Sequence, residues 1–113
     1  MKEDQLDIDE TTLSVDLSDA TEAVKESRFE DALNLLKIIL KDHPDHIDSL
    51  YLAAVSTRYL KKFDDSKKYI EKLLFNAPDM GRAYQELGHL NRDMGDEEKA
   101  VVHYRQACEL NPA

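Results

Sequence analysis

Three prolines place the strongest constraint on what this chain can fold into. Pro44, Pro78 and Pro112 are its only prolines, and each lies 34 residues from the next. A fixed period of this length is typical of proteins that stack one small structural unit several times. We therefore divide the chain into an N-terminal leader, residues 1–12, and three repeats, residues 13–46, 47–80 and 81–113.

Other residues recur in the same frame, so the proline spacing is not a coincidence. We call the residues that occupy the same place in successive repeats a column. Two columns hold small side chains, and others hold larger apolar side chains that recur at helical spacing on one face. Small residues let two antiparallel helices cross closely, and each proline ends the helix before it. The columns are Ala20, Ala54 and Gly88; Ala32, Ser66 and Ala100; Leu36, Ile70 and Tyr104; Ile39, Leu73 and Ala107; and Leu40, Leu74 and Cys108.

Each repeat is expected to hold two helices, separated at Ser27-Arg28, Lys61-Lys62 and Gly95-Asp96. The expected helices span residues 14–26, 29–42, 47–60, 63–76, 81–94 and 97–110, with boundaries good to a few residues.

These columns resemble the tetratricopeptide repeat family over about 100 of the 113 residues. The resemblance is strongest in the third repeat, and it departs in the first helix, where Asp16 and Asp19 stand at positions that the family fills with apolar side chains. It implies an all-α fold, an α-solenoid of three helix–turn–helix repeats with six antiparallel helices in a right-handed superhelix. It also implies a scaffold that binds a peptide or protein segment in a concave groove, rather than an enzyme.

Composition limits the classes of partner and the location. The net charge of −9 argues against nucleic-acid binding, which needs a basic surface. No apolar run is long enough to cross a bilayer, the N-terminus does not look like a secretory signal, and Cys108 is the only cysteine. We therefore expect a cytoplasmic protein that binds neither nucleic acid nor membrane.

The leader stands apart in charge from the repeats. It holds one lysine against five carboxylates, a net charge of −4, and few large apolar residues. This composition favours a disordered, solvated tail. A second hypothesis is that the leader folds back onto basic residues of the groove until a partner displaces it.

The groove should be lined by the first helix of each repeat. Arg58 and Arg92 are 34 residues apart and should lie side by side, where their guanidinium groups could bind carboxylates of an acidic or C-terminal peptide. The alternative is that both are ordinary solvated charges. The predicted groove residues are Tyr51, Val55, Arg58, Tyr59, Arg82, Gln85, His89 and Arg92.

One specialisation within the family is not predicted. Members that grip the acidic tails of heat-shock chaperones use Lys, Asn and Arg side chains spread over three repeats. Of the residues at the matching positions, only Arg82 is of a type that the clamp uses. The matching residues are Leu17, Thr21, Leu52, Arg82 and Glu86.

Catalytic, cofactor and metal sites are not predicted. His43 and His46 flank a turn without further ligands nearby, and the Asp64-Asp65 and Asp96–Glu98 clusters begin helices, where negative charge complements the helix dipole. Cys108 falls in a core column, so we expect it to be a buried apolar residue.

The last repeat should have an uncovered face, since stacked repeats usually end in a covering helix. Two explanations are open: the chain is a segment of a longer protein, or two copies stack end to end as a homo-oligomer through the C-terminal repeat.

The third repeat is also similar to N-terminal repeat segments of bacterial proteins that continue into a sulfotransferase domain. In that case this chain would be an accessory or regulatory segment. The residues expected to be uncovered are Val101, Val102, Tyr104 and Leu110.

Overall fold

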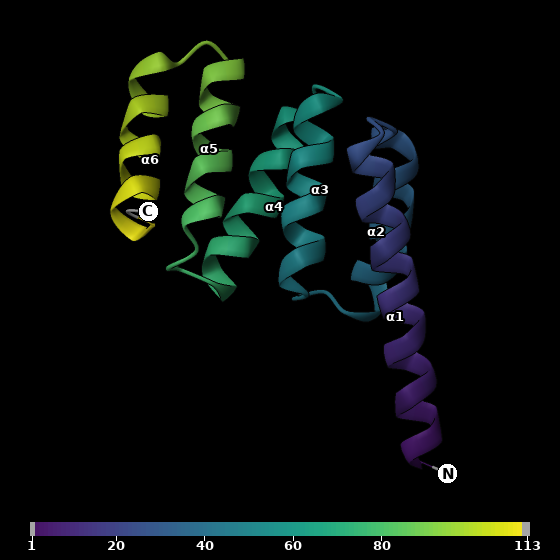
Figure 1. The fold of residues 1–113 in the computed structure, drawn as a ribbon. Helices are drawn as coiled ribbons and strands as arrows, with labels where there is room; N and C mark the ends of the chain where they lie inside the picture. Colours follow the sequence, from purple (N-terminus) through teal and green to yellow (C-terminus); the bar gives the residue numbers. More distant parts are fainter. Residues whose placement is uncertain (1, 112–113) are drawn as a thin grey trace.

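The computed structural model describes the backbone of residues 2–111 and the side chains of residues 12–111. Its six helices are α1 (Lys2–Lys25), α2 (Phe29–Asp42), α3 (Ile47–Tyr59), α4 (Phe63–Asn76), α5 (Gly81–Asp93) and α6 (Glu97–Leu110), and the described residues form no strand (Figure 1). The fold class predicted from the period is confirmed.

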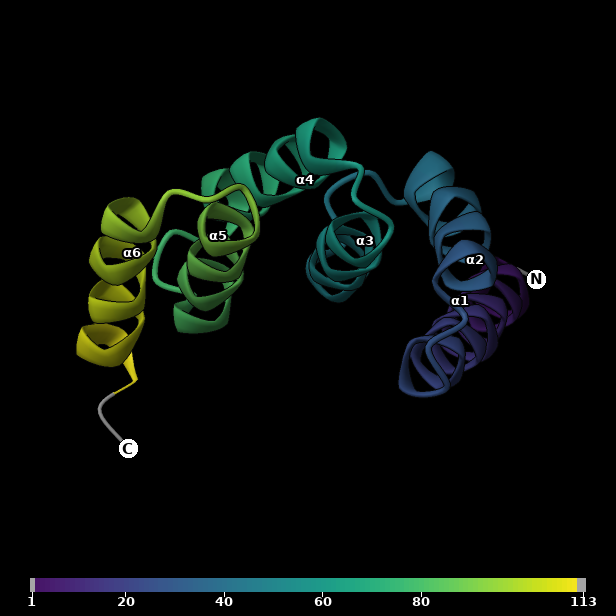
Figure 2. The ribbon, with the colours of Figure 1, turned by 90° about the horizontal axis from the view of Figure 1, so that it is seen from above.

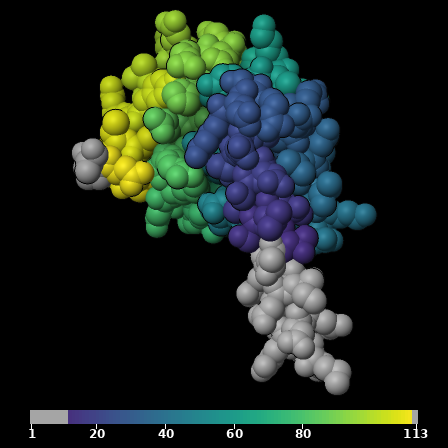
Figure 3. All heavy atoms as spheres, turned by 45° about the vertical axis from the view of Figure 1, so that its right-hand side comes forward, coloured from purple at the N-terminus to yellow at the C-terminus, as the bar shows by residue number. Residues whose placement is uncertain are grey.

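The helices form three antiparallel pairs that follow one another in an arch (Figure 2). Helices α1, α3 and α5 lie on the inner side of the arch, and α2, α4 and α6 lie on its outer side. Within the described chain, each helix contacts only helices of its own or an adjacent repeat. The space-filling view shows the first repeat, purple to blue, covering one end of the arch (Figure 3).

The small columns lie where the paired helices cross. All six residues of the two columns are buried, and in the second repeat the Ser66 hydroxyl donates a hydrogen bond to the carbonyl of Ala54 at 2.9 Å, which joins the two columns directly. In the third repeat, a Cβ placed on Gly88 would lie 2.6 Å from the ring of Tyr104. Glycine therefore makes room for an aromatic ring where the other two repeats have Leu36 and Ile70.

The turns within the repeats also follow the period. Ser27, Lys61 and Gly95 occupy the same column, and all three have positive φ, at 60°, 61° and 87°. Each lies two residues after the end of a helix, and the amide of the next residue donates to a carbonyl five residues earlier, as in Arg28 to Ala23 at 2.8 Å. A left-handed residue is thus required at this place in every repeat, although only the third repeat supplies glycine, which adopts it without strain.

The structure describes residues 2–11 of the leader by their backbone alone. The backbone of residues 2–12 is helical and continues α1 beyond the end of α2, away from α5 (Figure 1). Acidic residues at Glu3 and Asp4 favour this start, because negative charge in a first helical turn complements the dipole.

The C-terminal helix has an exposed apolar face, as expected. Val101, Val102 and Leu110 are exposed, and Tyr104 is half-buried. Cys108 is exposed as well, so its assignment to the core was wrong. The equivalent residues of the first two repeats, Leu40 and Leu74, are half-buried because a following helix packs near them, and no described helix follows α6. No helix in the described part of the chain is long and apolar enough to span a membrane.

Candidate functional site

The predicted groove residues lie on α3 and α5, two neighbouring helices on the inner side of the arch. The guanidinium carbon of Arg82 on α5 lies 4.4 Å from the centre of the Tyr51 ring on α3. Tyr51 is half-buried and Arg82 is exposed, so the ring supports a cation that faces solvent. Burial raises the pKa of the Tyr51 hydroxyl, with the Glu86 carboxylate adding to the effect, so this ring is neutral near pH 7.

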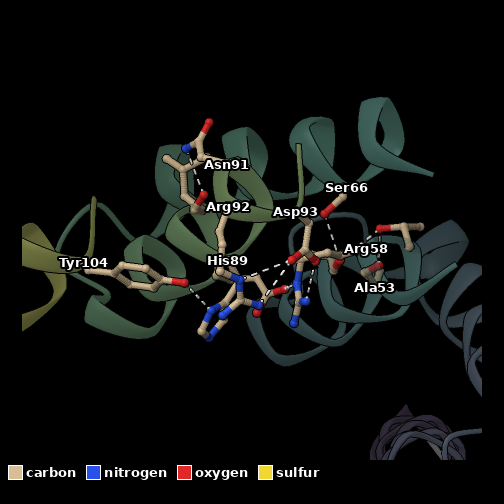
Figure 4. Close-up of polar contacts among 12 residues, drawn as sticks. Ala53, Arg58, Ser66, His89, Asn91, Arg92, Asp93 and Tyr104 are labelled. Atoms are coloured by element: carbon tan, nitrogen blue, oxygen red, sulfur yellow. Dashed lines mark hydrogen bonds and ion pairs between the residues drawn. The ribbon is translucent and has the colours of Figure 1, made fainter. Parts of the chain in front are cut away.

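Arg58 is not open to a partner, which corrects the expectation for its guanidinium group. Its side chain is 7% exposed and pairs with Glu86, itself 3% exposed, and with Asp93 at 2.9 Å from Nη1 to Oδ2 (Figure 4). Burial alone would lower the pKa of Arg58, but the hydrogen bonds to the two carboxylates outweigh it and raise that pKa. Arg58 therefore joins the second repeat to the third through a buried ion-pair network.

Arg92 lies beside this network, as the spacing predicted, and is exposed. Its Nη2 atom lies 3.2 Å from Oδ1 of Asp93, so Asp93 accepts hydrogen bonds from both arginines. Burial would raise the pKa of Asp93, but the bonds from Arg58 and Arg92 outweigh it and hold that pKa below its usual range. The two arginines are thus brought together by a carboxylate of the chain itself.

His89 connects the groove to the last helix. Its Nδ1 atom lies 2.7 Å from the hydroxyl of Tyr104 on α6, and the two rings meet edge to face (Figure 4). Burial lowers the pKa of His89, so the neutral ring predominates near pH 7.

The remaining predicted residues are spread over the same two helices. Val55 is half-buried and Gln85 is exposed. Tyr59 is exposed at the end of α3, where its ring stacks on Phe29 of α2 at 4.4 Å and lies beneath Arg58. Tyr59 therefore belongs to the edge of the arch, and a shallow pocket beside it is lined by Arg58, Tyr59, Lys61, Phe63, Arg92 and Asp93.

Glu86 and Asp93 are the residues whose role the sequence analysis missed. Asp93 lies 35 residues after Arg58, one residue from the 34-residue period that places equivalent residues side by side, whereas Glu86 lies only 28 residues after it. A search for opposite charges near the period would have found Asp93 but not Glu86.

Residues set aside in the sequence analysis have structural roles. His46 caps α3, with its Nδ1 atom accepting from the amide of Ser49, and Asp96 caps α6 by accepting from the amide of Lys99 at 3.1 Å. No group of three or more metal-ligating side chains forms a site within the described range.

Residues 81–113 match the tetratricopeptide repeat family. A comparison with curated protein sequences finds no match.

Solved structures with the same arrangement of helices are similar to this chain at low sequence identity. MamA from MSR-1 is 21% identical with a TM-score of 0.78, over 88% of this chain and 57% of MamA. The first tetratricopeptide domain of Spaghetti (RPAP3), bound to the HSP90 peptide SRMEEVD, is 18% identical with a TM-score of 0.80, over 88% of this chain and 79% of that one. The Sgt2 domain from Aspergillus fumigatus is 19% identical with a TM-score of 0.81, over 89% and 67%.

The TM-scores of 0.78, 0.80 and 0.81 show a shared fold. This chain spans less than two thirds of the length of the MamA structure, so the similarity concerns the arrangement of helices and not the activity of a whole protein.

Proposed function

Because this chain carries a tetratricopeptide repeat and folds as a tetratricopeptide solenoid, we propose that it is a protein-interaction scaffold whose inner face binds an extended segment of a partner. A solved domain of the same fold, that of RPAP3, is bound to a peptide. In this chain the peptide would lie across α3 and α5.

The cation held over Tyr51 carries this proposal. Arg82 is exposed and makes no ion pair with any side chain in the described range, in contrast to Arg58. An arginine fork held against an aromatic ring is suited to a carboxylate, since the ring fixes the plane from which the two N–H donors point. We therefore propose an acidic or C-terminal peptide as the ligand, with Arg82 as the principal contact, Gln85 beside it and Arg92 near the other end of α5.

The site is not that of a chaperone-tail clamp. Of the positions that such a clamp uses, Leu17 and Leu52 pack against the core, the Thr21 hydroxyl donates to the carbonyl of Leu17 at 2.7 Å, and Glu86 is buried in the ion-pair network. Only Arg82 remains, so the partner is a different carboxylate-bearing segment.

A peptide library tests the proposal directly. Peptides with free and amidated C-termini would be selected on the wild-type chain, and their affinities measured for Arg82→Ala and for Arg105→Ala, an exposed arginine on α6 that serves as the control. Loss of one charged hydrogen-bonded contact should weaken binding about tenfold in Arg82→Ala and leave Arg105→Ala unchanged. Selected peptides that bind Arg82→Ala and Tyr51→Ala as tightly as wild type would contradict it.

Self-assembly through the last repeat is a second candidate, favoured by the exposed apolar residues Val101, Val102 and Leu110 on α6. Concentration-dependent light scattering of the wild type and of a Val101→Ser, Val102→Ser variant would test whether these residues mediate self-association.

The third candidate, an accessory segment of a larger enzyme such as a sulfotransferase, is tested by the reading frame that follows Ala113.

A further inference from the structure

A pocket lies beside the junction of the second and third repeats, at the edge of the arch that holds the turns within the repeats. At the junction of the first and second repeats the Tyr59 ring stacks on Phe29, with 4.4 Å between the ring centres. Phe63 occupies the column of Phe29 in the second repeat, but the column of Tyr59 holds Asp93 in the third. An aspartate cannot stack on Phe63 as a ring would, so a hollow of about 410 Å³ remains at the later junction.

Most of the charged side chains that line this hollow are cations. Three are positive and one is negative, in a chain whose net charge is −9. When the buried Glu86 that pairs with Arg58 is counted as well, three cations still meet only two carboxylates. The hollow therefore has the charge to hold an anion. We name it the turn-edge pocket by its residues: Arg58, Tyr59, Lys61, Phe63, Arg92 and Asp93.

Two of the three cations have donors that the chain itself does not use. Lys61 is exposed and makes no ion pair with any side chain in the described range. The Arg92 side chain is half exposed, and its Nε and Nη2 atoms both meet one oxygen of Asp93, at 3.3 and 3.2 Å. The other oxygen of Asp93 accepts from Arg58 (Figure 4). One carboxylate thus serves two guanidinium groups, each of which has five N–H donors.

The turn does not explain why a lysine stands at position 61. Lys61 has a φ of 61°, and the same column holds Ser27 at 60° and Gly95 at 87°. Glycine adopts this left-handed conformation without strain, whereas a residue with a Cβ atom does not. Glycine would therefore form the turn better than lysine, and the ammonium group that Lys61 brings to the pocket comes at a cost to the stability of the fold.

The helix ends beside the pocket leave room for an anion. Helices α3 and α5 both end there, and the carbonyls of a helix C-terminus carry partial negative charge. In each helix three amides of the following turn donate to these last carbonyls, at 2.8 to 3.0 Å, so the carbonyls are bonded within the chain. Asp64 and Asp65 begin α4 nearby, but neither lines the pocket.

We propose that the turn-edge pocket binds a phosphate monoester, carried by a phosphorylated side chain of a partner protein. A phosphate monoester has a charge near −2 and three acceptor oxygens, which suit the ammonium of Lys61 and the fork of Arg92 together. A carboxylate would bring only the single charge that Asp93 already supplies. The bound phosphate would join Lys61 of the second repeat to Arg92 of the third.

The turn-edge pocket is separate from the peptide contact proposed at Arg82. Arg82 lies in the first turn of α5 and Arg92 in the last, about 15 Å apart at 1.5 Å per residue. The Arg82→Ala variant should therefore bind phosphate monoesters as the wild type does, and either site can be refuted without the other.

Titration of the full chain with N-acetyl-phosphoserine amide, followed by amide NMR near physiological ionic strength, tests the proposal. The wild type should bind with a Kd on the order of 1 mM, with the largest shifts in the turn around Lys61 and at the end of α5. Lys61→Gly should weaken binding about tenfold, since one charged contact is lost. The same variant should be at least as stable as the wild type in urea, because glycine suits the left-handed turn, so its loss of binding cannot come from unfolding.

The matched control is Lys62→Gln, which removes the same charge from the next residue. Lys62 is exposed, lies outside the pocket and is 3.6 Å from Glu30, so this variant should bind as the wild type does. Equal weakening in Lys62→Gln would show a general attraction between charges and would overturn the proposal. So would a wild type that binds no phosphate monoester, or one that binds N-acetyl-aspartate amide as tightly.

Inorganic phosphate distinguishes the two sources of the ligand. Weaker binding of inorganic phosphate than of the phosphoserine probe would support a phosphorylated partner protein. Tighter binding of inorganic phosphate, lost in Lys61→Gly, would overturn that source and assign the pocket to free phosphate compounds.

Discussion

The two junctions between repeats use the same columns with opposite chemistry. Between the second and third repeats, buried charges meet: Arg58 pairs with Glu86 and Asp93. Between the first and second repeats the equivalent residues are Val24, Leu52 and Tyr59. Val24 and Leu52 pack against an apolar cluster, and Tyr59 stacks on Phe29.

The difference shows which part of a repeat is constrained by the fold. The small columns must stay small because two helices cross there, whereas the junction columns tolerate either apolar or ionic sets. A buried ion pair gives little net stability over a well-packed apolar set, but it costs much when one partner is removed. The ionic junction should therefore be the more sensitive of the two to single substitutions.

Removing one partner of the ionic junction should have the largest effect. Glu86→Leu leaves the buried Arg58 guanidinium with Asp93 alone, and we expect it to lower the free energy of unfolding by about 3 kcal/mol. Urea denaturation measures this loss. Gln85→Leu, an exposed neighbour on the same helix, is the control and should change stability little. A comparable loss there would show that the effect of Glu86→Leu does not come from the ion pair.

Placing the apolar residues of the first junction in the second junction should restore most of the stability lost in Glu86→Leu. Arg58→Val combined with Glu86→Leu copies Val24 and Leu52 into the second junction, and Asp93 keeps Arg92 as a partner. We expect the double variant to recover about 2 kcal/mol or more relative to Glu86→Leu, since no charge remains buried without its partner. If the losses in the free energy of unfolding of the two single variants simply add in the double variant, the apolar set cannot replace the ionic one at this junction.

The apolar junction should show a smaller effect. Phe29→Leu keeps apolar volume but removes the stack on Tyr59, and we expect a loss of about 1 kcal/mol in the free energy of unfolding, with little dependence on salt. Phe63 occupies the same column in the second repeat, so Phe63→Leu is the matched control. An equal loss in both variants would mean that the stack contributes nothing beyond ring burial.

Acid should lower the free energy of unfolding through the ionic junction and not through the apolar one, and this is the smallest of the expected effects. The pKa of Asp93 is held below its ordinary value, so its contribution to stability is complete above pH of about 4 and is lost as pH falls through the lower folded pKa. Asp93→Asn should therefore flatten this part of the acid unfolding profile, by under about 1 kcal/mol because the side chain is partly solvated. A variant profile parallel to that of the wild type would assign the acid dependence to other carboxylates.

The period predicted the six helices well because it depends on side chains that meet inside each repeat. The ends of α2, α4 and α6 were predicted without error, and those of α3 and α5 within one residue. Contacts between repeats were harder: Arg58 was placed beside Arg92 correctly, but which carboxylate reaches it depends on helix rotation that the columns do not encode. Cys108 was misplaced because burial of its column depends on a following helix, and no described helix follows α6.

The neighbour-only packing of the repeats has a mechanical consequence. Since no helix of the first repeat touches the third within the described chain, a force applied across the arch is transmitted through the two junctions in series. Junctions in series carry the same force, so the one with the lower rupture force separates first. Opening of the ionic junction would part α3 from α5 and so separate Arg82 from Tyr51.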